Sequence, residues 1–551
     1  MNRFAIALDL GTSGFRAQAL NLATGEVVST AITKRHPLPG SNVIDHLHFA
    51  LELGVEKARN LVLLAINQVL QQLRICLDQV SRLAVCGNPT QLSLFQGMEI
   101  RDLAYAGSRK LQAMGVCIPH RAAAIRTANE FPELALAGDC DVVIPPAVHD
   151  EVGADALALI IQSGILNSQE TAIAIDYGTN AEMVLNHQGR LFTGSAAAGP
   201  ALEGQHISCG SLAMPGAITD IEADGESHRL LVLDGDMLPT LGALINLSLA
   251  TDATVTCEAD ATAITGTGVI AALDQALQAG VISPPKINTP DGQLHFGREI
   301  FFTESDLGEA GKAIGAIRAG YVTLGVEAGI APAEITTAYL AGASGTYVDA
   351  EKSARLGLIP PCVARVKQLG NTSLAMAREL AVTPSKLESM TDLSMRLRPT
   401  HTMFARSDTF SKLFLLELSR WTEGMPMATH REMLRRFHLP DLPASEGSPS
   451  ILRSMQRDVG NLGKHGLIIL ESVGKEVSLQ LEGCVACLSC IKACPADALS
   501  IDTTTHPASI SLMHARCNGV ACRRCEPECE PKVFHLSDFF DAKQDAVNRE
   551  H

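Results

Sequence analysis

Eight cysteines near the C-terminus form the most distinctive pattern in this 551-residue sequence. All eight lie within 46 residues, while the other seven of the 15 cysteines are scattered singly over the preceding 483 residues. The eight fall into two groups of similar spacing, Cys484-x2-Cys487-x2-Cys490-x3-Cys494-Pro495 and Cys517-x4-Cys522-x2-Cys525-x3-Cys529. Thiolates at such spacing are typical ligands of [4Fe-4S] clusters, which carry single electrons. The sequence therefore predicts two iron-sulfur clusters.

The first group resembles the cysteine run of bacterial ferredoxins with two clusters, in which the fourth cysteine of each run ligates the other cluster. This resemblance implies one ligand set of Cys484, Cys487, Cys490 and Cys529, and another of Cys517, Cys522, Cys525 and Cys494. The second group has one longer loop, and Glu530 separates its last cysteine from Pro531, so the type of the second cluster stays open. The alternative is a pair of zinc knuckles, but four-ligand zinc sites do not require a third sulfur so soon after the second.

A second pattern is an internal repeat. Residues 5–13 reappear as residues 172–180 with six of nine positions identical. Each copy is an apolar strand that ends in Asp-x-Gly-Thr, continues as a second strand, turns at a glycine and returns as a third. Two such units facing each other would bring both Asp-x-Gly-Thr turns to one cleft.

These turns have residues suited to holding a phosphate. The glycine lets the backbone approach the ligand, while backbone N–H groups and a hydroxyl donate hydrogen bonds to phosphate oxygens. The carboxylates of Asp9 and Asp176 are suited to binding Mg²⁺ directly or through water. The sequence contains no Gly-x4-Gly-Lys-Ser/Thr segment, so a P-loop is excluded.

The two turns and the segment 339–345 together resemble the phosphate-1, phosphate-2 and adenosine motifs of the actin, Hsp70 and sugar-kinase superfamily. Within it, residues 86–89, 176–182 and 195–204 resemble the reductive activators of corrinoid-dependent enzymes. Having C-terminal clusters and no N-terminal [2Fe-2S] domain, the chain is most similar to the archaeal activases that serve the corrinoid proteins of methylamine methyltransferases. The resemblance implies an α/β fold, a two-lobed RNase H-like ATPase with a C-terminal ferredoxin-like α+β module carrying two clusters.

The resemblance also implies roles for particular residues. Asp9 and Asp176 would be the catalytic carboxylates, and ATP with Mg²⁺ would be bound in the cleft between the lobes. The ATP-binding residues would be Gly11, Thr12, Ser13, Gly178, Thr179, Asn180, Gly342, Ala343 and Gly345.

The activity that the resemblance implies is ATP-dependent, one-electron reduction of Co(II) to Co(I) on a corrinoid protein of methylamine metabolism and methanogenesis. The partners would be that corrinoid protein of a methyltransferase system and an electron donor. Two alternatives remain. The chain could donate electrons to another low-potential acceptor, as the activators of radical dehydratases and aryl-CoA reductases do. It could also be a non-catalytic scaffold that senses nucleotide.

Around these motifs, the sequence predicts four regions. Residues 1–170 would form the first ATPase lobe with an inserted segment, and 171–400 the second lobe. Residues 401–470 read as a helical connector, and 471–545 as the ferredoxin-like domain. Apolar spacing predicts a helix over 55–74, and Thr303-x-x-Asp306 predicts the start of a helix that continues to 320.

Composition excludes several classes of function. A formal charge of −16 and only 22 aromatic residues are unlike a nucleic-acid binder. Apolar runs are too short for a spanning helix, and the N-terminus lacks the features of a secretory signal, so we expect a cytoplasmic protein without a membrane partner. In a reducing compartment, clustered cysteines are metal ligands rather than disulfides.

Four other features could bind ligands but have ordinary structural explanations. Lys312 could reach a phosphate, and 266–268 could form a further turn facing the nucleotide. Residues 220–225 weakly resemble a calcium loop, and His46 and His48 form a histidine pair. We expect a solvated lysine, ordinary polar turns, and histidines that point apart on a helix and are either structural or face a partner.

Overall fold

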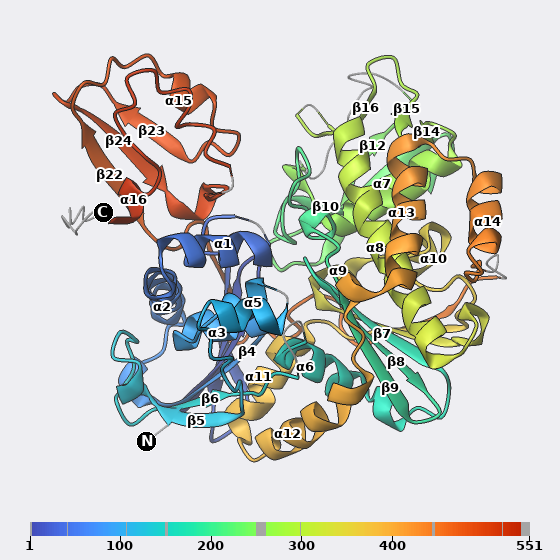
Figure 1. Ribbon diagram of the computed structural model, residues 1–551, viewed down its shortest axis with the longest axis horizontal. Coiled ribbons are helices and arrows are strands. Elements are labelled where there is room, and N and C mark those ends of the chain that lie inside the picture. Colours follow the sequence, from blue (N-terminus) through green and yellow to red (C-terminus); the bar gives the residue numbers. More distant parts are fainter. Residues whose placement is uncertain are drawn as a thin grey trace.

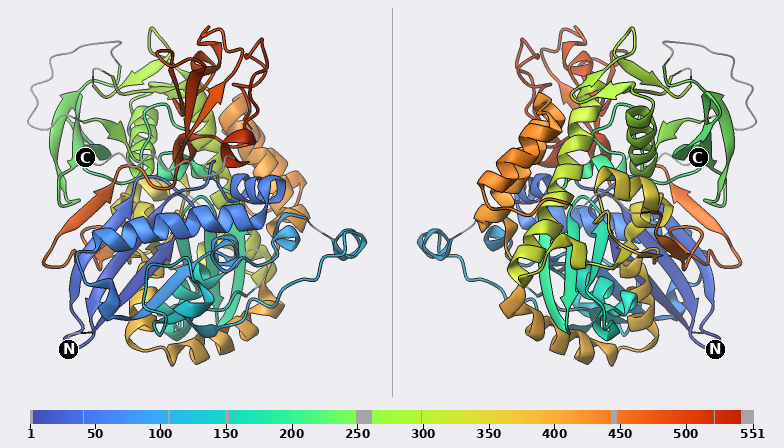
Figure 2. Two further views of the ribbon diagram at one scale, coloured as in Figure 1. Left: turned by 90° about the vertical axis from the view of Figure 1, so that its left-hand side faces the viewer. Right: turned by 90° about the vertical axis from the view of Figure 1, so that its right-hand side faces the viewer.

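Two large mixed β-sheets form the body of the protein, and a small three-stranded sheet lies near the C-terminus (Figure 1). The computed structural model describes residues 3–40, 42–105, 107–148, 152–248, 261–297, 299–442, 447–520 and 522–541. Each large sheet, with the helices packed on it, forms one lobe. Figure 2 shows that the C-terminal sheet lies on the side of the first lobe that carries α1 (Val43–Leu53).

The repeated units fold as the sequence predicts, each as three consecutive antiparallel strands. Nearly every position of the first strand in each unit is buried, which explains the continuous apolar runs. The units pair in the same way, first strand with second and second with third. Their strands are β1 (Phe4–Leu10), β2 (Phe15–Asn21) and β3 (Val27–Thr33), then β7 (Ala172–Tyr177), β8 (Ala181–His187) and β9 (Arg190–Ala196).

The first sheet has the strand order β21-β3-β2-β1-β4-β6-β5, with β1, β4 and β6 parallel. The helix expected over 55–74 is α2 (Val55–Gln72), which packs over β2 and β3. The other strands are β4 (Val80–Gly87), β5 (Ala124–Thr127), β6 (Asp141–Ile144) and β21 (Leu467–Leu470). Further helices of this lobe are α3 (Pro89–Gln96), α4 (Arg101–Ala104), α5 (Ser108–Ala113) and α6 (Ala154–Ser163).

The second sheet has the order β20-β19-β18-β7-β8-β9, with β7, β18 and β19 parallel. Its long helix α8 (Glu304–Ala328) begins with the expected capping box and runs beyond residue 320. Other elements here are β18 (Thr337–Ala341), β19 (Arg365–Gln368), β20 (Ser450–Arg453), α7 (Gly266–Gln278), α9 (Gly342–Tyr347) and α10 (Ala350–Leu356). A four-stranded sheet extends the lobe, formed by β10 (Ala217–Asp224), β11 (Ser227–Leu233), β12 (Pro239–Ile245) and β13 (Ala263–Ile264).

The structure departs from the expected regions at residues 372–470. Helix α11 (Thr372–Val382) packs on β1, β4 and α6, so it belongs to the first lobe rather than the second, and α12 (Lys386–Leu397) shares the same core. Helix α13 (Asp408–Glu423) packs along α8 and against α14 (Met427–Arg436). The expected connector also supplies β20 to the second sheet and β21 to the first. It is therefore a structural part of both lobes.

The C-terminal sheet has the order β22-β24-β23 and is antiparallel throughout. It follows β21 after five residues and encloses a small apolar core of its own, which includes several of the clustered cysteines. Its elements are β22 (Glu476–Leu481), α15 (Ser489–Lys492), β23 (Leu499–Asp502), β24 (Ala508–Met513) and α16 (Asp538–Asp541). We call residues 471–541 the cysteine module.

Candidate functional site

A pocket lies where the carboxyl ends of parallel strands from both sheets meet: β1 and β4 of the first sheet, and β7, β18 and β19 of the second. In open α/β sheets, ligands bind beyond the carboxyl ends of the strands. The hollow is open to solvent and encloses about 650 Å³, solvent space included. Nine of the residues predicted from the sequence line it: Asp9, Gly11, Thr12, Asp176, Gly178, Thr179, Asn180, Gly342 and Ala343.

The two Asp-x-Gly-Thr turns touch each other across the lobes. The hydroxyl oxygens of Ser13 and Thr179 lie 3.3 Å apart. Both hydroxyls donate to one carboxylate oxygen of Glu203, with a distance of 2.6 Å from Ser13. The predicted convergence of the repeated turns is therefore present, and Glu203 is the residue that joins them.

Carboxyl groups dominate the electrostatics of this pocket. Burial raises the pKa of Asp9 to about 6, although Arg16 and Asn371 oppose the shift. Burial, together with the neighbouring carboxylates of Asp155, Asp9, Glu203 and Asp458, raises the pKa of Asp176 to about 8. Such crowding disfavours ionisation of these carboxyl groups, and a bound cation would reverse that preference.

A buried ion pair borders the carboxyl groups. Arg16 on β2 lines the pocket and donates from Nε to Oδ2 of Asp458 at 2.8 Å. Asp458 lies between β20 and β21, and its backbone N–H donates to the Tyr347 hydroxyl at 3.2 Å. The segment that runs from one sheet to the other is thus anchored beside the pocket.

Two helix caps contribute side chains that sequence reasoning did not assign to the site. Asn88 caps α3 and donates from Nδ2 to the Thr12 hydroxyl at 2.9 Å. Asn371 caps α11 and donates to Asp9 at 2.8 Å. An asparagine just after a buried strand, with proline at the next position in α3, is a readable signal for a helix start facing the strand ends.

Gly342 lies at the turn after β18 and contacts the carboxylate of Asp176. Its φ of +80° is in the left-handed region, and an added Cβ would lie 2.3 Å from Oδ1 of Asp176. Glycine is therefore required at this position for two independent reasons. Gly345, also expected to bind nucleotide, does not line the pocket. It lies inside α9, where its carbonyl accepts from Nε2 of Gln368 at 2.8 Å.

The clustered cysteines gather in two places. Four of them line one hollow of about 320 Å³, and in this set Cys494 comes from the first group and the rest from the second: Cys494, Cys517, Cys522 and Cys525. Burial and the neighbouring thiols raise the pKa of Cys517 to about 12. Burial likewise raises the pKa of Cys490, with contributions from Cys529 and Cys487. Each fourth cysteine therefore lies with the other group.

Backbone N–H groups point at two of these sulfurs. Ala498 donates to Sγ of Cys494, and Gly519 donates to Sγ of Cys517, both at 3.3 Å. Hydrogen bonds of this kind adjust the reduction potential of an iron-sulfur cluster. Among the described residues, no three His, Cys, Asp or Glu side chains are arranged around one point as a single metal ion requires.

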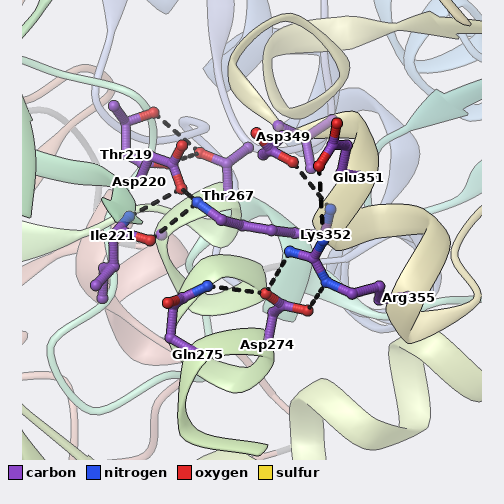
Figure 3. Close-up of polar contacts among 12 residues, drawn as sticks. Thr219, Asp220, Ile221, Thr267, Asp274, Gln275, Asp349, Glu351, Lys352 and Arg355 are labelled. Atoms are coloured by element: carbon purple, nitrogen blue, oxygen red, sulfur yellow. Dashed lines mark hydrogen bonds and ion pairs between the residues drawn. The ribbon is translucent and has the colours of Figure 1, made fainter. Parts of the chain in front are cut away.

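The weaker candidates have structural roles in the second lobe. Figure 3 shows Lys352 of α10 reaching Asp220, and its Nζ also donates to the Ile221 carbonyl at 2.9 Å. Thr267 donates to the Thr219 carbonyl at 2.8 Å. These contacts tie β10 to α7 and α10, and the Asp220 carboxylate in the segment 220–225 is paired with a lysine.

The remaining candidates also lie outside the pocket. Lys312 pairs with Glu309 at 2.6 Å on the exposed side of α8. His46 is fully buried in α1, while His48 is exposed two residues later. Among the scattered cysteines, Cys257 lies outside the described residues.

Comparison with known proteins shows which family has this arrangement. Residues 4–168 match the family described as the RACo middle region, and residues 170–431 match the C-terminal domain of RACo, the ASKHA domain. The [Co(II) methylated amine-specific corrinoid protein] reductase of Methanosarcina barkeri is 46% identical over 499 residues, covering 90% of this chain and 92% of that protein. The chain belongs to the family of reductive activators of corrinoid proteins.

Two more distant relatives agree with this assignment. The corrinoid activation enzyme RamQ of Eubacterium limosum is 22% identical over 404 residues, which cover 67% of this chain and 62% of RamQ. A solved structure, the reductive activator for corrinoid,iron-sulfur protein, is 25% identical with a TM-score of 0.63, covering 76% of this chain and 66% of that one. The family resemblance read from the turns is thus confirmed, as is the ASKHA fold of the second lobe. None of the helices in the described ranges is long and apolar enough to cross a membrane.

Proposed function

We propose that this activator uses ATP to drive the one-electron reduction of Co(II) to Co(I) on a corrinoid protein of methylated-amine metabolism. The observation that carries the proposal is the 46% identity, over nine-tenths of the chain, to a reductase of that class of corrinoid protein. The electron comes from an external low-potential donor and passes through the cysteine module to the cobalt of the partner. ATP is bound and Mg²⁺ is held in the pocket between the lobes.

The pocket suits a magnesium nucleotide in its donor chemistry. The carboxyl groups of Asp9 and Asp176 are buried together, and their raised pKa values indicate a site that favours a cation. The turns after β1 and β7 present backbone N–H groups and hydroxyls to phosphate oxygens. Gly342 and Ala343 leave space for the nucleoside at the end of β18.

The cysteine module suits two [4Fe-4S] clusters and a ferredoxin-like fold. Four thiols from two different parts of the module line one hollow, which is the ligand number that a [4Fe-4S] cluster requires. The placement of Cys494 with the second group supports the ligand exchange expected of ferredoxins. When bound, the clusters supply one-electron transfer, and the chain's own contribution is to position the sulfurs and donate N–H groups to them.

The need for ATP follows from the energy of the step. For a one-electron couple, 59 mV corresponds to about 1.4 kcal/mol. A gap of a few hundred millivolts is therefore on the order of several kcal/mol, and differential binding of nucleotide to two arrangements of the lobes can supply energy of that size.

The test is anaerobic reconstitution with optical detection of Co(I). The purified activator is mixed with a reductant, Mg-ATP and the corrinoid proteins of methylated-amine methyltransferases, and the cobalt spectrum is followed. We expect Co(I) only when ATP is present, and much slower formation with Asp176→Asn. Asp291→Asn is a matched control, because Asp291 is a carboxylate that pairs with His295 away from the pocket.

The outcomes separate the proposal from its alternatives. ATP-dependent reduction of an acceptor dye with no effect on any corrinoid protein would indicate a different acceptor. Co(I) formation that is the same with and without ATP, and unaffected by Asp176→Asn, would indicate a scaffold. A metal analysis that finds zinc in place of about eight iron atoms per chain would exclude electron transfer by two cubanes.

A further inference from the structure

The cysteine module rests on a defined part of the first lobe, which we call the seat: residues 35–40 and helix α1. The backbone N–H of Gly40 donates to the carbonyl of Cys517 at 2.8 Å. On α1, the ring of Phe49 meets that of Phe540 edge to face, with centroids 4.8 Å apart. A proposed ligand of the second cluster is thus bonded through its own backbone to the seat.

Behind the seat lies a buried cluster of polar side chains. The backbone N–H of Leu38 donates to Nδ1 of His36 at 3.1 Å, so the ring proton of His36 is on Nε2. That nitrogen lies 2.9 Å from Oε1 of Gln91, which accepts from it. Nε2 of Gln91 then donates to Nδ1 of His46 at 2.8 Å.

Both histidines are neutral, so this cluster has one consistent pattern of donors and acceptors. Burial lowers the pKa of His36 well below its usual value, and burial lowers that of His46 to about 3. Their rings stack with centroids 4.1 Å apart. Gln91 therefore holds both parts of the seat, one through each atom of its amide.

The same glutamine is also connected to the nucleotide pocket. Its backbone N–H donates to Oδ1 of Asn88 at 3.0 Å, and Nδ2 of Asn88 donates to the Thr12 hydroxyl at 2.9 Å. Thr12 belongs to the first Asp-x-Gly-Thr turn and lines the pocket. Hydrogen bonds therefore lead from the phosphate turn to Leu38, and the backbone of 38–40 continues the path to Gly40 and its bond with Cys517.

We propose that Gln91 is a positioning residue that couples nucleotide binding at the Thr12 turn to the redox state of the cluster held by Cys517. The inference rests on the proposed function, because it requires both nucleotide and cluster to be bound. Leaving a buried donor or acceptor unpaired is costly, so a shift of the phosphate turn moves the seat instead of breaking a bond. By linkage, the cluster's redox state must then change nucleotide affinity to the same extent.

The test measures this coupling directly in the full, iron-loaded chain. The affinity for Mg-ATP is determined for the oxidised protein and for the dithionite-reduced protein, and the ratio of the two affinities is the coupling factor. For the unaltered chain we expect a ratio in the usual allosteric range, about 5- to 150-fold. Gln91→Met keeps the volume but removes the amide, and it should bring the ratio close to one while the oxidised protein still binds Mg-ATP.

Gln68→Met is the matched control. Gln68 on α2 holds the start of the cysteine module through two bonds to Gly474, at 2.8 and 3.2 Å. This variant weakens the attachment of the module without touching the Gln91 cluster, so its ratio should stay as in the unaltered chain. If the Gln91→Met variant loses iron, His46→Phe is used as the test variant instead. Phenylalanine keeps the ring stack with His36 and removes the acceptor for Gln91.

Each result has a definite meaning. An unaltered chain that binds no Mg-ATP, or that holds no iron, contradicts the proposed function itself. A chain that binds both but shows a ratio of one overturns the inference alone. So does an unchanged ratio in Gln91→Met and His46→Phe. Equal loss of coupling in Gln68→Met would show that attachment of the module, and not Gln91, carries the effect.

Discussion

Binding of a magnesium nucleotide should release a proton and become tighter as pH rises towards 8, because Asp176 must lose its proton to face a cation. Burial and four neighbouring carboxylates raise its pKa to about 8. The direction of this pH dependence follows from which protonation state of Asp176 binds Mg²⁺. The carboxylate binds Mg²⁺ and the carboxylic acid does not, so every pH unit below 8 weakens binding by roughly tenfold, or about 1.4 kcal/mol. Above pH 8 this dependence should disappear.

The perturbation that isolates this effect is Asp176→Asn. ATP itself titrates near neutral pH, but that contribution is common to both proteins, so the difference between them belongs to Asp176. The variant should bind more weakly at pH 8, and its affinity should change less between pH 6 and pH 8. The smaller rise in the pKa of Asp9, to about 6, should remain in the variant as a dependence at the acidic end of that range.

Isothermal titration calorimetry provides the measurement. Mg-ATP or a non-hydrolysable analogue is titrated at pH 7 into protein in two buffers with different ionisation enthalpies, and the difference in heat counts the protons released. We expect close to one additional proton released by the unaltered chain relative to Asp176→Asn. Equal proton counts and parallel pH profiles for the two proteins would refute the assignment of Asp176 as a protonated, cation-facing group.

Three other changes test the site and the module. Gly342→Ala should abolish nucleotide binding because its Cβ would clash with the second carboxylate, whereas Gly329→Ala, also at positive φ but with open space around it, should lose only about 1 kcal/mol of stability in denaturant unfolding. Arg16→Met leaves Asp458 buried and unpaired, and should reduce the free energy of unfolding by about 3–5 kcal/mol. Cys494→Ser should remove the electron paramagnetic resonance signal of the second cluster and about half of the iron, although Cys494 belongs to the first cysteine group.

The parts of the fold that the sequence predicted are those with local signals. The strand-turn-strand units are marked by apolar runs, a glycine turn and their own repetition. The start of α8 is marked by a capping box in which Thr303 and Asp306 bond each other's backbone N–H groups. Such signals depend on residues within a few positions of each other, so they can be recognised from the sequence alone.

The parts that were missed depend on contacts between distant residues. Strands β20 and β21 have four residues each, and β20 is exposed along its whole length, so nothing local separates them from a linker. They are strands only because the edges of the two large sheets pair with them. In the same way, Asp458 is a pocket-bordering residue because Arg16 lies 442 positions away in sequence and 2.8 Å away in space.

The path of the chain between the two sheets has a mechanical consequence for the proposed reaction. After β20 leaves the edge of the second sheet, the segment passes Asp458, bonded to Arg16 beside the pocket, and joins the edge of the first sheet as β21. The cysteine module begins directly after β21 and is seated on the same lobe through Gly40 and α1. A rotation of the lobes about bound nucleotide therefore strains a segment fixed to both sheets, while the module moves with the first lobe. A nucleotide that binds both lobe arrangements with equal affinity shifts no equilibrium between them. The effect of nucleotide on the electron-transfer step is therefore limited by the difference between its affinities for the two arrangements.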